Sequence, residues 1–336
     1  MDIHLNEIMN LMSIKSKDVL MVGICGLGGV GKSTMVKAIY NELSYHFKSK
    51  SFLDRVGDVC KGHHDLLDLQ KQLFCDISPR RKRKISTLAE GINVLKNVLC
   101  HEKVLLVIDD VNYKEQLENL AGGHDWFAEG SRIFITSRDK SLLVRHKVDE
   151  LYELPQLNWD QALELFSWHA FDRRHPYDDF SKLSNRFVQY CQGLPLALKT
   201  LGSFLFKMQP DEWESELSKL DEEPNMEILD VLKVSLNGLQ DTHKAIFLDI
   251  ACFFKGKYKD FIIKILDGCG FHAESGIRFL KNRCLLTISN GKIGMHNLIQ
   301  QLGHKIVRDE GLKNKGMRSR LWNHMDVLDV LKKRTV

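Results

Sequence analysis

The sequence has no long apolar run. No stretch of eighteen consecutive apolar residues occurs, and the most apolar segments, 104–108 and 245–254, are too short or carry the charge of Asp249. A helix that crosses a bilayer needs about 20 apolar residues. The first residues, MDIHLNEIMNLMSIKSKDV, contain acidic and polar side chains where a secretory signal needs an uninterrupted apolar core. We therefore expect neither a membrane span nor secretion.

The sequence also lacks a charge excess, closely spaced cysteine pairs and internal repeats. Its 336 residues carry 48 Lys and Arg against 44 Asp and Glu, so composition does not indicate a nucleic-acid or membrane partner. None of the 8 cysteines forms a C-x-x-C pair. This spacing argues against a zinc site and favours reduced thiols in a protein of the cytoplasm or nucleus. No period of leucine-rich repeats is visible.

The chain is long enough for more than one domain. Up to residue 154, β-prone runs at 19–25, 50–56, 104–108 and 132–136 alternate with helical stripes, which are segments with apolar residues at helical spacing. This alternation predicts an α/β domain with a parallel sheet covered by helices. Helical stripes alone follow in 155–224, which predicts a helical domain. Further helices precede LLTISNGKIGMH, whose Asn290-Gly291 pair suits a tight type I′ hairpin. We assign 225–325 to a winged-helix domain and 326–336 to a C-terminal tail.

The segment GICGLGGVGKSTM at 23–35 contains two overlapping phosphate-binding patterns. GLGGVG matches the dinucleotide fingerprint G-x-G-x-x-G, and Asp54 lies where that fold places its ribose-binding acid. GLGGVGKS matches the Walker A loop of nucleoside-triphosphate binders, the P-loop. The glycine pattern alone does not decide between the two ligands.

Lys32 and Asp109 favour the triphosphate. A lysine at the first turn of the helix after the loop reaches phosphate oxygens. Asp109 closes a buried β-prone run, as a Walker B acid does when it holds Mg²⁺ together with a loop hydroxyl, here that of Ser33. We therefore predict a P-loop NTPase domain that binds ATP or ADP, with Mg²⁺ accompanying ATP.

Seven segments in order resemble the motifs of plant NB-ARC disease-resistance proteins. They are GLGGVGKST, KVLLVIDDVN, GSRIFITSRDKSLL, YELPQLNWDQALELFSWHAF, CQGLPLALKTLGSFL, FLDIACFFKG and MHNLIQQLGHKIV. The match extends over about residues 1 to 325. Asn112 after the double aspartate, together with FLDIACFF, resembles the class that carries a TIR domain. The resemblance implies the central nucleotide-binding switch region of such a receptor, without the TIR domain and the leucine-rich repeats.

The resemblance also implies roles for individual residues. The phosphate-binding residues would be Gly26, Gly28, Gly29, Val30, Gly31, Lys32, Ser33 and Thr34. Ser33 and Asp109 would ligate Mg²⁺, Asp110 would orient or deprotonate water, and Arg138 would read the γ-phosphate. Pro195 would pack near the base or sugar, and His296 would reach the β-phosphate of ADP. Without the resemblance, Asp110 and Arg138 are also compatible with a helix cap and a surface cation, and Pro195 with a first-turn helix residue.

Two positions depart from the family pattern. Asn297 stands where Met-His is usually followed by Asp, and His4 stands where the family has an arginine. The first change removes a negative charge that helps to hold the closed ADP state in the family. We therefore expect the ADP-bound resting state to be less stable here. The second puts adenine contacts from the N-terminal segment in doubt.

The functional hypothesis is a conformational switch, resting with ADP and active with ATP, in a plant immune receptor of the cytoplasm or nucleus. ATP hydrolysis would at most return the switch slowly to its ADP-bound resting state. One rival is a constitutively active AAA-like ATPase. The other is a winged-helix DNA-binding regulator, although segment 297–309 is only modestly basic and DNA binding is not favoured. Other receptor chains or signalling proteins are possible partners.

Overall fold

The computed structural model describes residues 5, 7–8, 18–59, 62–80, 83–220, 223–311 and 315–333. His4, one of the two departures from the family pattern, lies outside these residues. The chain forms two compact units. The first consists of Met1–Gly26 and Gly31–Pro155, and the second of Leu27–Val30 and Gln156–Val336.

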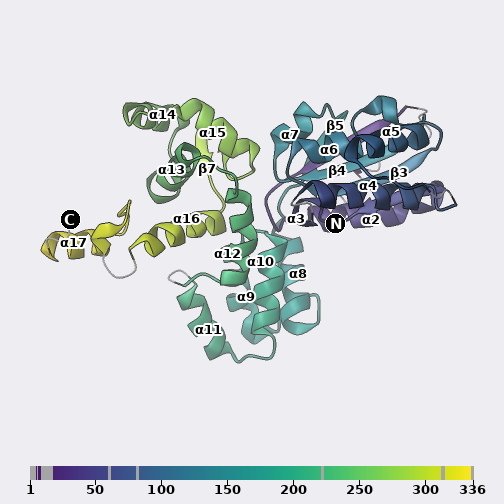
Figure 1. Ribbon diagram of the computed structural model, residues 1–336. Coiled ribbons are helices and arrows are strands. Elements are labelled where there is room, and N and C mark those ends of the chain that lie inside the picture. The colour runs from purple at the N-terminus through teal and green to yellow at the C-terminus, as the bar shows by residue number, and fades with distance from the viewer. Residues whose placement is uncertain are drawn as a thin grey trace. The chain divides into compact units, whose positions relative to one another are not determined.

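A five-stranded sheet is the centre of the first unit (Figure 1). Its strands are β1 (Leu20–Cys25), β2 (Ser49–Leu53), β3 (Val104–Val111), β4 (Arg132–Ser137) and β5 (Glu150–Glu153). They lie in the order β2-β3-β4-β1-β5, and all neighbouring strands are parallel. Because parallel strands end at the same edge, the carboxyl ends of β1, β3 and β4 lie together there.

Helices cover the sheet because alternate strand residues point to opposite faces. The helices are α2 (Lys32–Leu43), α3 (Val56–Val59), α4 (His63–Ile77), α5 (Leu88–Leu99), α6 (Lys114–Leu120) and α7 (Lys140–Arg145). Leu106, Ile108 and Ile133 share one core cluster with apolar residues of α4, α5 and α6. All eight residues of β3 are buried, as its continuous apolar run predicts.

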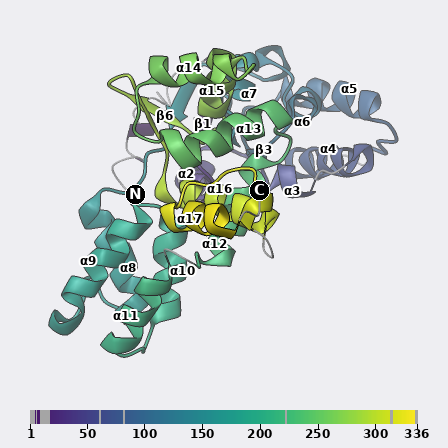
Figure 2. The same cartoon turned by 90° about the vertical axis from the view of Figure 1, so that its left-hand side faces the viewer.

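Helices make up most of the second unit. They are α8 (Trp159–Phe171), α9 (Ser181–Cys191), α10 (Pro195–Leu205), α11 (Pro210–Lys219), α12 (Met226–Lys233), α13 (Asp241–Asp249), α14 (Lys259–Gly268), α15 (Ala273–Asn282), α16 (Asn297–Glu310) and α17 (His324–Lys333). A π-helical turn, Ile250–Phe254, follows α13 directly. Helices α8 to α11 lie together as a bundle in both views (Figure 1 and Figure 2).

A two-stranded hairpin, β6 (Thr287–Ser289) and β7 (Lys292–Gly294), precedes α16. Asn290 and Gly291 both have positive φ, 50° and 73°, which confirms the type I′ turn. Helices followed by this hairpin form the predicted winged-helix arrangement. The predicted fold class, an α/β P-loop domain followed by helical and winged-helix parts, is therefore confirmed.

Three details differ from the sequence-based expectation. Strand β3 continues through Asp109 and Asp110 to Val111, with a register shift against β4 between Ile108 and Val111. Strand β5 had no predicted counterpart, because its partly exposed ELYE segment lacks a strong apolar pattern. The proposed C-terminal tail contains most of helix α17. In the part of the chain that the structure describes, no helix is both long enough and apolar enough to cross a bilayer.

Trp213 is the centre of the bundle core. Its side chain is fully buried and contacts the rings of Phe166, Phe171, Phe180 and Phe187, with ring centroids 5.0 to 5.7 Å apart. Its indole N–H donates to the carbonyl oxygen of Leu205 at 3.2 Å. The ring therefore joins α11 to α8, α9 and α10.

Replacing Trp213 with Ala should lower the free energy of unfolding by about 3–5 kcal/mol, because it empties a fully packed site. Chemical denaturation followed by circular dichroism measures the change. Trp159→Ala is the matched control, since that side chain is 49% exposed at the start of α8 and should change stability by less than about 1 kcal/mol. Equal losses in the two variants would show that Trp213 does not organise the bundle.

Candidate nucleotide-binding site

The P-loop connects β1 to α2. Gly31 is the N-cap of α2 with φ 102°, a conformation that favours glycine, and a Cβ at this position would meet no atom within 4 Å. No side chain caps the helix, and its first turn has no acidic residue. The first N–H groups of a helix have no acceptor inside the helix and attract anions. The start of α2, at Lys32, Ser33 and Thr34, therefore suits a phosphate.

The middle of the loop, Leu27–Val30, belongs to the second unit. There the N–H of Leu196, in the first turn of α10, donates to the carbonyl oxygen of Gly29 at 3.2 Å. Gly29 has φ 79°, and a Cβ on it would lie 2.7 Å from Cβ of Leu196. Both conformation and space therefore require glycine at this position.

Lys32 is 6% exposed, and its Nζ donates to the carbonyl oxygen of Gly26 at 3.0 Å. The ammonium group thus lies against the start of the loop that it is predicted to serve. Asp54, on which the dinucleotide interpretation depends, forms ion pairs with Lys37 at 3.3 Å and with Arg55 at 3.6 Å.

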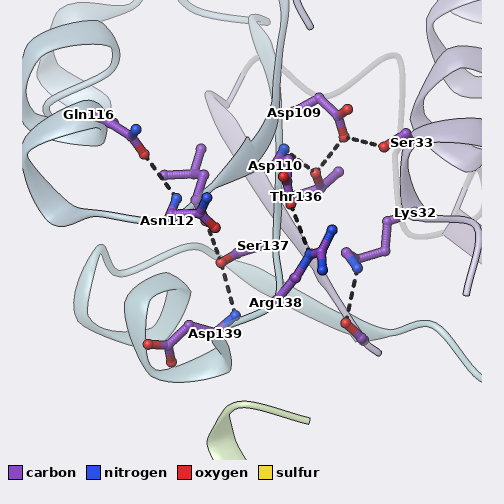
Figure 3. Close-up of polar contacts among 12 residues, drawn as sticks. Lys32, Ser33, Asp109, Asp110, Asn112, Gln116, Thr136, Ser137, Arg138 and Asp139 are labelled. Carbon is purple, nitrogen blue, oxygen red and sulfur yellow. Dashed lines mark hydrogen bonds and ion pairs between the residues drawn. The ribbon is translucent and has the colours of Figure 1, made fainter. Parts of the chain in front are cut away.

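Asp109 connects the P-loop to the sheet edge (Figure 3). Its Oδ1 accepts hydrogen bonds from Ser33 Oγ at 3.1 Å and from Thr136 Oγ1 at 2.6 Å. The residue is fully buried, yet its Oδ2 has no hydrogen-bond partner among the described residues. A buried carboxylate oxygen without a partner is costly unless a cation compensates it. Asp109 and Ser33 together are hard oxygen ligands that fit Mg²⁺.

Asp110 and Arg138 form an ion pair beside this carboxylate. Arg138 Nε lies 3.4 Å from Asp110 Oδ1, and both side chains are largely buried. The N–H of Asp110 donates to Thr136 Oγ1 at 2.7 Å. Asp109 and Asp110 therefore share Thr136 but have different side-chain partners.

Pro195 and His296 both lie in the second unit. Pro195 is the first residue of α10 and is half-buried. His296 is the N-cap of α16, and its Nδ1 accepts the N–H of Leu298 at 3.1 Å. Burial lowers the pKa of His296 to about 4, although the nearby backbone of Gln192 and Cys191 offsets part of that effect. His296 is therefore neutral near pH 7, lying close to the turn between α9 and α10.

Asn297 contacts two elements of the second unit. Its side-chain oxygen accepts a hydrogen bond from Lys255, and its N–H donates to Gln192 Oε1 at 2.9 Å. Lys255 Nζ also donates to Gln300 Oε1 at 2.9 Å, so both of these acceptors are neutral amides. Burial lowers the pKa of Lys255, consistent with a cation that these contacts compensate only in part.

Sequence reasoning missed Thr136, Leu196 and Lys255. Thr136 belongs to the predicted strand 132–136, where a hydroxyl in an apolar run is a signal for a buried polar role. Lys255 follows the π-helical turn, a feature that is common at functional sites but has no sequence signature of its own. Leu196 contributes its backbone N–H, which no side-chain pattern reveals.

The parallel sheet, the P-loop and the carboxylate at the end of β3 define a P-loop NTPase. Solved structures agree on the fold. The chain resembles the Walker-type ATPase of Pyrococcus abyssi with a TM-score of 0.60 at 12% identity, covering 90% of this chain and 95% of that one. For the ORC2 protein of Aeropyrum pernix the TM-score is 0.51 at 12% identity, covering 92% of each chain.

The chain belongs to the NB-ARC family, because the NB-ARC domain model matches residues 1–175. The family and the P-loop fold imply nucleotide binding. Residues 240–311 match the winged-helix domain described as Disease resistance protein Roq1-like.

Plant resistance proteins are among the relatives that match this chain. Disease resistance protein RUN1 of Vitis rotundifolia is 48% identical over 97% of this chain and 24% of that protein. TMV resistance protein N of Nicotiana glutinosa is 40% identical over 99% of this chain and 29% of that protein. The chain thus spans about a quarter of the length of these relatives.

Thr136→Val should lower the free energy of unfolding by about 1–3 kcal/mol, because the buried N–H of Asp110 and the Asp109 carboxylate lose a partner. Urea denaturation measures this loss. Thr136→Ser keeps the hydroxyl and should lose clearly less. Equal destabilisation by Val and Ser would contradict this prediction, because the hydroxyl would then contribute no more to stability than the methyl group.

Proposed function

We propose that this chain is the nucleotide-operated switch of a plant intracellular immune receptor that acts in defense response and signal transduction. The ADP-bound form is the resting state, and the ATP-bound form is the active state. Membership of the NB-ARC family and the identity to plant disease resistance proteins support this proposal. Such a receptor works in the cytoplasm or the nucleus, with other receptor chains or signalling proteins as partners.

The observation that carries the nucleotide assignment is the buried, unpartnered Oδ2 of Asp109 beside Ser33. A triphosphate brings a Mg²⁺ ion with it, and these two oxygens would hold that ion. When bound, Mg²⁺ neutralises phosphate charge. Lys32 would exchange its hydrogen bond with Gly26 for one with a phosphate oxygen, and the uncapped start of α2 would receive the anion.

Other roles in the site remain predictions. Among them are phosphate contacts from the loop residues Gly26, Gly28, Gly29, Val30, Gly31 and Thr34. We also retain Pro195 as the residue beside the base or sugar, and His296 as the contact to the β-phosphate of ADP. A neutral His296 can donate one hydrogen bond to that phosphate from Nε2, because its Nδ1 is occupied by the N–H of Leu298.

A nucleotide can operate the switch only through its different affinity for the two states. Complete switching, from 1:99 to 99:1, needs a difference of about 5.5 kcal/mol. The γ-phosphate and its Mg²⁺ supply contacts that ADP lacks, and Asp109 and Arg138 are the residues proposed to make them. Hydrolysis, with Asp110 as the candidate to orient water, would act as a slow reset.

The DNA-binding alternative is not favoured. Helix α16 would be the recognition helix, but the segment 297–309 is only modestly basic. A constitutive AAA-like ATPase is likewise not favoured by the resemblance to plant resistance proteins. Steady-state turnover would separate that alternative from a switch.

Purified protein should release ADP or ATP when it is denatured, and Lys32→Ala should release much less. The lysine supplies a charge that a neutral side chain does not replace, and hydrogen bonds to charged groups contribute about 1.5–3 kcal/mol each. Chromatography of the supernatant identifies and counts the nucleotide. Lys37→Ala, further along α2 and paired with Asp54 outside the loop, is the control. Absence of an adenine nucleotide from the unmodified protein would contradict the switch.

Asn297→Asp should slow the release of bound ADP, because it places a carboxylate against the half-buried Lys255. We expect release to slow about fivefold to tenfold, measured with a fluorescent ADP analogue. Lys255→Met in the same background should cancel the gain. Faster release from Asn297→Asp than from the unmodified protein would refute the idea that Asn297 loosens the resting state.

A further inference from the structure

Asp110 has a backbone conformation that is unusual for a residue with a side chain. Its φ is 59°, in the left-handed region, at the register shift between Ile108 and Val111. Such a conformation costs about 1–3 kcal/mol and persists only where surrounding contacts enforce it. Here the hydrogen bond from the Asp110 N–H to Thr136 Oγ1, 2.7 Å long and buried, is one such contact.

The carboxylates of the two adjacent aspartates have different partners. In a regular strand, neighbouring side chains point to opposite faces of the sheet. Here Asp109 contacts Ser33 while Asp110 meets Arg138, the first residue after β4 (Figure 3). Asp110 thus combines a left-handed backbone conformation with an ion pair to Arg138.

The ion pair is poorly screened by solvent. The side chains of Arg138 and Asp110 are 16% and 10% exposed. Opening a pair as buried as this is costly unless another anion takes the place of Asp110 beside Arg138.

We infer that Asp110 sets the preference between nucleoside diphosphate and triphosphate by competing with the terminal phosphate for Arg138. The inference rests on the proposed function, in which Arg138 reads the γ-phosphate. ADP lacks that phosphate and leaves the pair intact. ATP must draw the guanidinium away from Asp110, so its affinity is reduced by the free energy of opening the pair. Asp110 is thus a positioning and specificity residue for Arg138.

Asp110→Asn tests this competition. Asn keeps the size, removes the charge and is one of the few side chains that tolerate the left-handed region. The full chain is titrated in Mg²⁺ with ADP and with a non-hydrolysable ATP analogue, so that hydrolysis does not enter the measurement. We expect affinity for the ATP analogue to rise about tenfold, the size of one charged hydrogen bond, and that for ADP to change by less than about twofold.

Arg138→Gln separates competition from simple charge repulsion. If Asp110 acts through Arg138, adding Asp110→Asn to Arg138→Gln leaves the ratio of the two affinities unchanged. A rise of the same size in the double variant would mean that the carboxylate repels phosphate directly, and it would overturn the inference. So would a single Asp110→Asn variant with slower hydrolysis and an unchanged affinity ratio, as expected of a residue that only activates water.

Asp110→Gly is a second variant that removes the carboxylate and suits the left-handed backbone even better. It should give the same shift toward the ATP analogue, and thermal melting verifies that each variant is folded. If the unmodified chain binds neither nucleotide, the proposed function fails and the inference fails with it. If it binds both and neither Asp110 variant changes the affinity ratio, only the inference fails.

Discussion

The hydrogen bond between Thr136 and Asp109 is the contact on which the rest of the site depends. It places a fully buried carboxylate at the edge of the sheet and leaves one of its oxygens without a partner among the described residues. A buried charge of this kind is unfavourable unless a cation approaches it. Ser33, at the start of α2, is already bonded to the same carboxylate. The hydrogen bond between Ser33 and Asp109 thus brings together the two side chains that are proposed as the Mg²⁺ ligands.

One hydroxyl contacts both of the adjacent aspartates. Thr136 accepts the N–H of Asp110 while it donates to Asp109, so one side chain fixes both residues. The Asp109 side chain is oriented toward the P-loop. Asp110 has a left-handed backbone conformation, and its side chain forms an ion pair with Arg138. Parallel strand order makes this possible, because β3 and β4 are neighbours and their carboxyl ends lie side by side.

The second unit contains a half-buried cation whose hydrogen-bond acceptors are neutral amides. Lys255 follows a π-helical turn and contacts the amide oxygens of Asn297 and Gln300. Asn297 in turn bonds to Gln192 at the end of α9, which ties the start of α16, and with it His296, to the turn before α10. The orientation of His296 therefore depends on a polar chain rather than on apolar packing alone.

The amino-acid sequence by itself determined the fold class, the P-loop, the hairpin and the identity of the carboxylates. Glycine spacing, β-prone apolar runs and the Asn290-Gly291 pair are local properties, and each has one favoured backbone solution. The sequence did not predict β5, the continuation of β3 past Asp109, or the partners of Asp110 and Asn297. Only the tertiary structure decided these, because they depend on which strands become neighbours and, for Asn297, on which helical segments of the second unit pack together. The contacts of Thr136 with the two aspartates and of Lys255 with Asn297 join residues that are at least 26 positions apart in the sequence. The left-handed conformation of Asp110 lies at a register shift between two strands.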